Sequence, residues 1–323
     1  MSAHNWLITG VRQCWQYCLL LGLLLLWVEG AAQPPPRERR GGKPKASRPR
    51  PPAPARAPLR EQDPPTIRQA VTEATKLEAA FKDSEALSQF QEVLKLSPGH
   101  YYSLWQAAVL SVRIGARYSD ETRKSAYFDA ARDYADRALL LQPEGGESNY
   151  AVALALFNQA TLRNARGRLK AYRDLRSHVY LATERRPDLP DAWQLLGRWQ
   201  YRVAHYNLLE RVFSKLALGG VPQGGNSRAA MESLEKARRL DPGRLQFCYD
   251  LARMYSYQGR RQMAIAVLRE AARIPPITSD DLVVSRLCQQ MLPPLVRKDL
   301  RRQKREARRL PRPASPPDTL ANK

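Results

Sequence analysis

Cysteine, histidine and aromatic residues are scarce in this sequence of 323 residues. Four cysteines are too few for a small domain held together by disulfides. No Cys-x-x-Cys or His-x-x-x-His pair exists, so the sequence offers no structural zinc site. Phe, Trp and Tyr make up 8% of the chain, and Ala and Leu prevail over Val and Ile. This balance favours packed helices and argues against a β-sandwich.

Acidic residues are also in short supply. The chain has 31 Asp and Glu against 53 Lys and Arg, which gives a formal net charge of +22. Much of the excess lies in two flanks: residues 33–62 hold nine basic and two acidic residues, and residues 297–323 hold ten basic and three acidic. Nucleic acid is not favoured as a partner, because a nucleic-acid-binding domain concentrates its Lys and Arg on one folded face.

Residues 1–32 have the features of a secretion signal, with a polar start followed by the apolar run Cys18–Val28. Gly30 and Ala32 provide the small side chains that a signal peptidase accepts, so we expect cleavage near Ala32 and export to a periplasm or the cell exterior. The run is shorter than the roughly 20 residues that cross a bilayer. A short, uncleaved membrane anchor is the alternative.

The composition of the two flanks predicts segments that form no hydrophobic core. Residues 33–65 are rich in Pro and in Arg and Lys, a composition typical of an extended, disordered linker. Residues 293–323 read as a second basic, disordered tail, within which residues 297–309 are a candidate for a short helix. Such flanks can attract an anionic membrane or an envelope polymer.

A helical signature recurs five times between residues 66 and 292. It consists of a small residue, a bulky one four positions later, a small one seven later and Pro twelve later. The first copy is Ala86, Phe90, Val93 and Pro98, and the last is Ala264, Leu268, Ala271 and Pro276. Spacings of three and four keep these side chains on one helical face, and Pro ends the helix.

This is the tetratricopeptide pattern, and it predicts an all-α, right-handed solenoid of about five helix pairs with long inter-helix insertions over residues 66–292. The longest insertion, residues 206–226, contains a Gly-rich stretch that we interpret as a helix connector. We expect Trp193 and Leu196 to be buried between repeats. The signature positions are Trp193, Leu196, Gly197, Ala230, Pro242, Leu251, Ala252, Tyr255, Gly259, Ala264 and Pro276.

Four segments resemble the regulators of microtubule dynamics, a family of eukaryotic tetratricopeptide proteins. They are Leu104-Trp105, Asp191 to Trp199, Leu209 to Lys215, and Ala230 through Asp241-Pro242, within a region from about Ser84 to Leu292. The resemblance implies a helical scaffold that binds partners, with microtubules and membranes among those that the family uses.

The first helix of each pair in such a solenoid lines the concave side, which gives a set of candidate groove residues. They are Tyr102, Trp105, Arg113, Tyr150, Asn158, Gln194, Arg198, Tyr201, Arg202, Tyr249, Arg253 and Tyr257. Arg binds carboxylates in a bidentate manner and Tyr adds apolar contact, so this set suits an extended, acidic protein segment. The alternative for each Tyr and for Trp105 is packing against a neighbouring repeat.

We therefore predict an exported, non-catalytic scaffold that binds a protein partner in its groove. The alternative is a membrane-anchored adaptor resembling the microtubule regulators, which binds microtubules or organelle membranes. No motif for catalysis, a metal or a cofactor stands out, because the three histidines beyond residue 32 lie in different repeats. Cys248 and Cys288 could pair in an oxidising compartment or stay free as small core residues.

Overall fold

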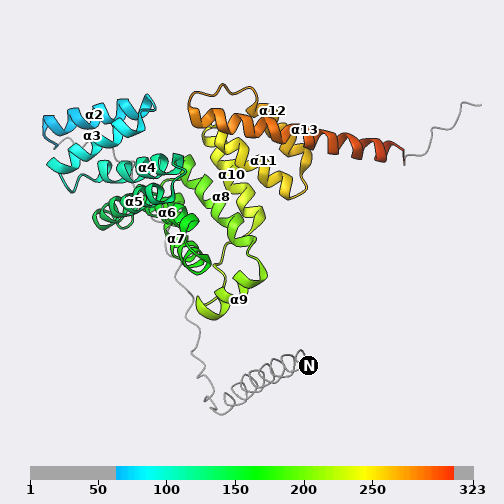
Figure 1. The fold of residues 1–323 in the computed structure, drawn as a ribbon, viewed down its shortest axis with the longest axis horizontal. Coiled ribbons are helices and arrows are strands. Elements are labelled where there is room, and N and C mark those ends of the chain that lie inside the picture. Colours follow the sequence, from blue (N-terminus) through cyan, green and yellow to red (C-terminus); the bar gives the residue numbers. More distant parts are fainter. Residues whose placement is uncertain (1–62, 309–323) are drawn as a thin grey trace, which may run out of the picture. The chain divides into compact units, whose positions relative to one another are not determined.

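The computed structural model describes residues 63–308. The predicted signal or anchor, the linker up to Gln62 and the tail from residue 309 lie outside the described residues. Within residues 63–308 the chain forms helices α2 to α13 and no strand (Figure 1). This confirms the predicted all-α class, and none of these helices is long and apolar enough to cross a bilayer.

The helices form five sequential pairs. The pairs are α2 (Pro65–Ala79) with α3 (Asp83–Leu96), α4 (Tyr101–Arg117) with α5 (Glu121–Leu141), α6 (Gly146–Leu162) with α7 (Ala165–Arg185), α8 (Pro190–Ala204) with α10 (Ser227–Leu240), and α11 (Leu245–Tyr257) with α12 (Arg261–Ala271). The second helix of each pair contacts the first helix of the next. This is the predicted tetratricopeptide arrangement of stacked helix pairs.

Small residues let the paired helices approach closely. A Cβ atom on Gly197 of α8 would lie 2.7 Å from Leu234 and 3.0 Å from the carbonyl oxygen of Ala230, both on α10. Ala252 and Ala264 are likewise completely buried between α11 and α12. Gly259 adopts a φ of +72°, which turns the chain from α11 into α12 and which other residues rarely adopt.

The insertions are accommodated in two ways. α5 and α7 each have 21 residues, against 14 in α10 and 11 in α12, so the extra residues at the second and third pairs extend the helices. At the fourth pair they form an additional short helix, α9 (Leu208–Ala217), and the Gly-rich connector between it and α10. α9 contacts α7.

The buried tryptophan of α8 is Trp199 rather than Trp193, which corrects the expectation. Trp199 is completely buried and its Nε1 donates to the carbonyl oxygen of Tyr172, 2.7 Å away. Trp193 is half-buried, with its Nε1 on the carbonyl oxygen of Pro187 and the Lys236 ammonium over its ring. Trp193 lies near the start of α8 and packs against the edge of the core cluster while staying partly exposed, whereas Leu196 is buried as expected.

The predicted boundary at residue 292 is also corrected, because the last helix, α13 (Ser279–Ala307), runs through it. Pro293 and Pro294 lack the amide hydrogens that a helix interior uses, and they are exposed. Val284, Cys288 and Leu295 on the same helix are buried against α11 and α12. The apolar face of α13 therefore continues past the two prolines, although the basic composition of this segment did not indicate it.

Cys248 of α11 and Cys288 of α13 are both buried and free. They belong to one core cluster. Burial raises the pKa of the Cys288 thiol to about 11 and also raises that of Cys248. Both thiols are therefore protonated near neutral pH and serve as small core residues.

The different environments of the two tryptophans give a stability prediction. Trp199→Ala should lower the free energy of unfolding by about 3–5 kcal/mol, because it leaves a large cavity and removes the hydrogen bond to the carbonyl oxygen of Tyr172. Trp193→Ala should cost clearly less, since its ring is partly solvated. Urea denaturation followed by circular dichroism measures both. Equal losses for the two variants would contradict the assignment.

Candidate partner-binding surface on α8 and α11

The structure divides the predicted groove residues into two groups. Those of α4 and α6 form the internal contacts of the first three helix pairs. Those of α8 and α11 include the exposed Arg198, Arg253 and Tyr257. The second group is therefore the more exposed of the two.

The aromatic residues of α4 pack against one another and against α3. The rings of Tyr102 and Trp105 meet edge to face with centroids 5.4 Å apart, and Tyr102 meets Phe90 in the same way at 5.9 Å. Gln106 donates to the Tyr102 hydroxyl over 3.0 Å. Trp105 also packs between two core clusters. Tyr102 and Trp105 therefore pack inside the protein, which was the alternative to a role in the groove.

Arg113 of α4 is held by carboxylates inside the protein. Its Nη1 donates to buried Asp83 over 2.9 Å, and its Nη2 lies 3.5 Å from Glu78. Burial opposes the positive charge, but these carboxylates outweigh burial and raise the pKa of Arg113. Burial raises the pKa of Glu78 despite Arg113, and the shorter of the two contacts is the one to Asp83.

Arg117 extends this network to the start of α13. It donates to Asp83 of α3 over 2.6 Å and to Asp280 of α13 over 2.8 Å. The latter contact joins residues 163 positions apart in the sequence. The charges of Arg113 and Arg117 thus connect α3, α4 and α13.

The two candidates on α6 are likewise structural. Tyr150 is only 6% exposed, and burial raises its pKa well above the ordinary value. Asn158 donates from Nδ2 to the carbonyl oxygen of Leu154, 2.8 Å away on the same helix. Their positions on a first helix predicted exposure, but Tyr150 is buried among the helices that contact α6, and Asn158 is half-buried.

Two of the candidates on α8 fix neighbouring helices. Gln194 donates to Asp250 of α11 over 2.7 Å. Arg202 makes a two-pronged ion pair with Glu210 of α9, whose side chain is nearly buried. Because both partners are internal, Gln194 and Arg202 are positioning residues for α11 and α9.

The remaining five residues form one surface, which we call the Tyr/Arg surface: Arg198, Tyr201, Tyr249, Arg253 and Tyr257. The rings of Tyr201 and Tyr257 stack with centroids 5.8 Å apart and join α8 to α11. The Arg253 guanidinium lies 5.5 Å from the Tyr249 ring centroid and 6.0 Å from that of Tyr257. Arg198 lies over Phe157 of α6 at 4.9 Å.

The Tyr/Arg surface is positively charged and keeps its donors available. Among residues 63–308 no carboxylate lies within 4.0 Å of Arg198 or Arg253, whereas Arg113, Arg117 and Arg202 all have such partners. Burial raises the pKa of Tyr201, so its hydroxyl remains protonated at neutral pH. Guanidinium groups beside phenol rings bind carboxylates and add apolar contact.

His205 joins this surface, and the repeat pattern missed it. Its exposed ring lies 4.0 Å from that of Tyr201, and its Nδ1 donates to the carbonyl oxygen of Tyr201 over 2.8 Å. The signal that identifies it is its position four residues after Tyr201, which places both side chains on one helical face.

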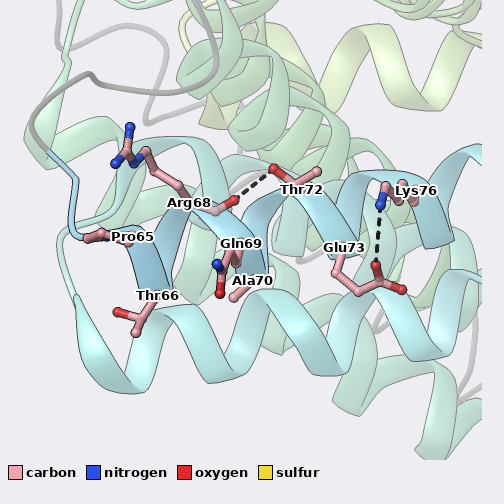
Figure 2. A pocket seen from close by; sticks show the side chains of 8 residues that line it. All are labelled: Pro65, Thr66, Arg68, Gln69, Ala70, Thr72, Glu73 and Lys76. Atoms are coloured by element: carbon pink, nitrogen blue, oxygen red, sulfur yellow. Dashed lines mark hydrogen bonds and ion pairs between the residues drawn. The ribbon is translucent and has the colours of Figure 1, made fainter.

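A depression lies along α2, away from the Tyr/Arg surface. The described residues that line it belong to this single helix (Figure 2). The Thr72 hydroxyl donates to the carbonyl oxygen of Arg68 over 2.8 Å, and Lys76 lies 3.9 Å from Glu73 (Figure 2). No group of three potential metal ligands occurs in residues 63–308.

Comparisons with known proteins agree with this fold. The model of the family described as regulator of microtubule dynamics protein 1-3 matches residues 70–295. Regulator of microtubule dynamics protein 3 of Bos taurus is 28% identical over 181 residues, which cover 52% of this chain and 37% of that protein. The Rattus norvegicus protein is 28% identical over 180 residues, covering 55% and 38%. The chain thus spans less than half the length of these relatives.

Among solved structures, a thermophilic tetratricopeptide-repeat protein of Thermus thermophilus superposes with a TM-score of 0.51. It is 16% identical, and the match covers 70% of this chain and all of that protein. This likeness shows the tetratricopeptide fold.

The division of the groove residues into internal and exposed ones gives a prediction for the change of Arg to Gln at two positions. Arg113→Gln should lower the free energy of unfolding by about 1–3 kcal/mol, because buried Asp83 then loses one of its two cationic partners. Arg198→Gln should change it by about 0.5 kcal/mol or less, as for an exposed side chain. Thermal and urea denaturation measure both, and a larger loss for Arg198→Gln would contradict the division.

Proposed function

The chain belongs to the regulator of microtubule dynamics family, and on that premise we propose that it is a non-catalytic adaptor which binds a protein partner through the Tyr/Arg surface. The observation that carries the proposal is the pair Arg198 and Arg253. Within the described residues they are exposed, lie beside aromatic rings and have no carboxylate partner.

The chemistry of this surface favours an acidic segment of the partner. An unpaired guanidinium next to a tyrosine gains most from a carboxylate that it can bind through two hydrogen bonds. The stacked Tyr201 and Tyr257 rings add rigid contact area, which costs little conformational entropy on binding. Assembled microtubules are the first partner to test, because the curated relatives are named for microtubule dynamics.

Membership of the family also supports a proposal for the cellular location of the adaptor. Microtubules are found in the cytoplasm, and an exported chain would not meet them there. We therefore propose that residues 1–32 are retained as a membrane anchor, which is the second of the two interpretations that the sequence allows, and that the Pro-rich residues 33–62 connect this anchor to the helical body.

The location proposal predicts the mass of the native chain. Protein purified from eukaryotic cells should have the intact mass of a chain that still contains residues 1–32, and it should sediment with membranes until detergent is added. A mature protein that begins at Gln33 and appears in the medium would instead establish export.

The binding proposal predicts the effect of a double substitution. Arg198→Gln with Arg253→Gln should weaken binding to assembled microtubules about a hundredfold, since each charge-assisted hydrogen-bonded pair contributes about 1.5 kcal/mol. Cosedimentation at a series of microtubule concentrations and at two salt concentrations measures the loss.

The matched control is Arg269→Gln with Arg273→Gln, which removes the same charge from exposed positions on and just after α12. The control should bind like the parent chain. If both double variants bind equally, the Tyr/Arg surface is not the binding site. If the parent does not cosediment, microtubules are not the partner, and a synthetic Glu-rich peptide then tests the surface itself.

A further inference from the structure

α9 carries an apolar face that no part of residues 63–308 covers. Leu208, Leu209 and Leu216 are 76%, 79% and 82% exposed, and Val212 is also exposed. With about 100° between successive residues of an α-helix, these four side chains fall within an arc of about 100°. Four exposed apolar side chains gathered on one short helix form a patch rather than scattered surface residues.

The exposure does not come from a loosely attached helix. Asn207 and Glu210 form a reciprocal capping box at the start of α9, and Glu210 is paired with Arg202 of α8. Phe213 and Leu218 pack against the core cluster of α6, α7 and α8. The inner face of α9 is therefore fixed to the body, and its leucines are held outward.

Basic residues lie beside this apolar face on α9, and others are exposed on the neighbouring helix α7. Arg211 and Lys215 of α9 are exposed, and they lie next to the leucines on the helix surface. α9 contacts α7, whose residues Arg166, Lys170 and Arg173 are also exposed. The connector after α9 is tied to the same helix, because Arg176 of α7 donates to the carbonyl oxygen of Gln223 over 2.8 Å.

We propose that α9 docks on an anionic membrane surface, with its leucines inserted among the acyl chains and the basic residues of α7 and α9 at the headgroups. A short helix that joins an exposed apolar face to a cationic border is the form that interfacial helices take. The border selects negative headgroups, since each Lys or Arg near such a surface gains attraction from it. The proposal does not depend on the Tyr/Arg surface or its partner.

The test places a fluorescent, environment-sensitive amino acid at position 216 of the full chain. Vesicles of phosphatidylcholine with phosphatidylserine should shift its emission to the blue, and vesicles of phosphatidylcholine alone should not. Position 140 at the end of α5 is the matched control, because Leu140 is also 82% exposed and lies outside the α9 patch. The probe at 140 should not shift with either vesicle.

A readout at position 216 is needed because the apolar run in residues 1–32 can bind vesicles by itself. A charge variant completes the test: Arg166→Gln with Lys170→Gln and Arg173→Gln should raise the phosphatidylserine vesicle concentration for half the shift about a hundredfold, since each basic residue contributes about a factor of five. Unchanged helix content by circular dichroism checks that this variant is folded.

Four results would overturn the proposal. Equal responses at positions 216 and 140, or a shift that does not require phosphatidylserine, would remove the anionic membrane as the ligand. An emission at 216 that turns blue with protein concentration alone would indicate a second copy of the chain on this face. An emission that is already blue without vesicles at every concentration would mean that the chain itself covers α9.

Discussion

The close approach of helices at small residues is the constraint on which the rest of the structure depends. Gly197 has no room for a side chain against Leu234 and Ala230, and Ala252 and Ala264 leave no exposed surface between α11 and α12. Helices that are this close bury the bulky residues beside them, Trp199 and Leu251 among them, with few gaps. The position of every functional side chain on α8 and α11 follows from this packing, because a rigid pair of helices fixes the direction of its outer face.

The spacing of small residues and prolines was enough to predict the class, the repeat type and the five helix pairs, because these depend on neighbours three to twelve positions apart. What the sequence could not provide was the identity of partners far along the chain. Arg113 looked like an exposed groove residue, yet its carboxylate is Asp83, 30 positions away. Trp193 matches the repeat signature, but the cavity formed by α7 and α8 accepts Trp199. The continuation of α13 past two prolines likewise depends on Leu295 meeting a core built from α11 and α12.

The same long-range pairing explains why only part of the predicted groove is available. Near α4 the arginines meet Asp83, Glu78 and Asp280, so their charge holds α3, α4 and α13 together. The carboxylate nearest to Arg253 along α11 is that of Asp250, and it accepts hydrogen bonds from Gln194 and Gln246 instead. Arg253 is left with aromatic neighbours, as is Arg198. The distribution of acidic residues, more than that of the arginines, therefore decides where this protein can bind a negative partner.

Arg202 shows how closely the two exposed surfaces are connected. It is one turn from Arg198 on α8, but it pairs with Glu210, and Glu210 also caps α9 by accepting from the backbone amide of Asn207. A single carboxylate thus takes part both in the capping box at the start of α9 and in the ion pair that joins α9 to α8. Burial raises the pKa of a carboxyl group, yet the pairing with Arg202 and the hydrogen bond from Asn207 outweigh burial and keep the pKa of Glu210 below its ordinary value. The link between the two surfaces therefore remains ionised throughout the physiological pH range, and it connects the leucines of α9 to Arg198 and Tyr201 of α8.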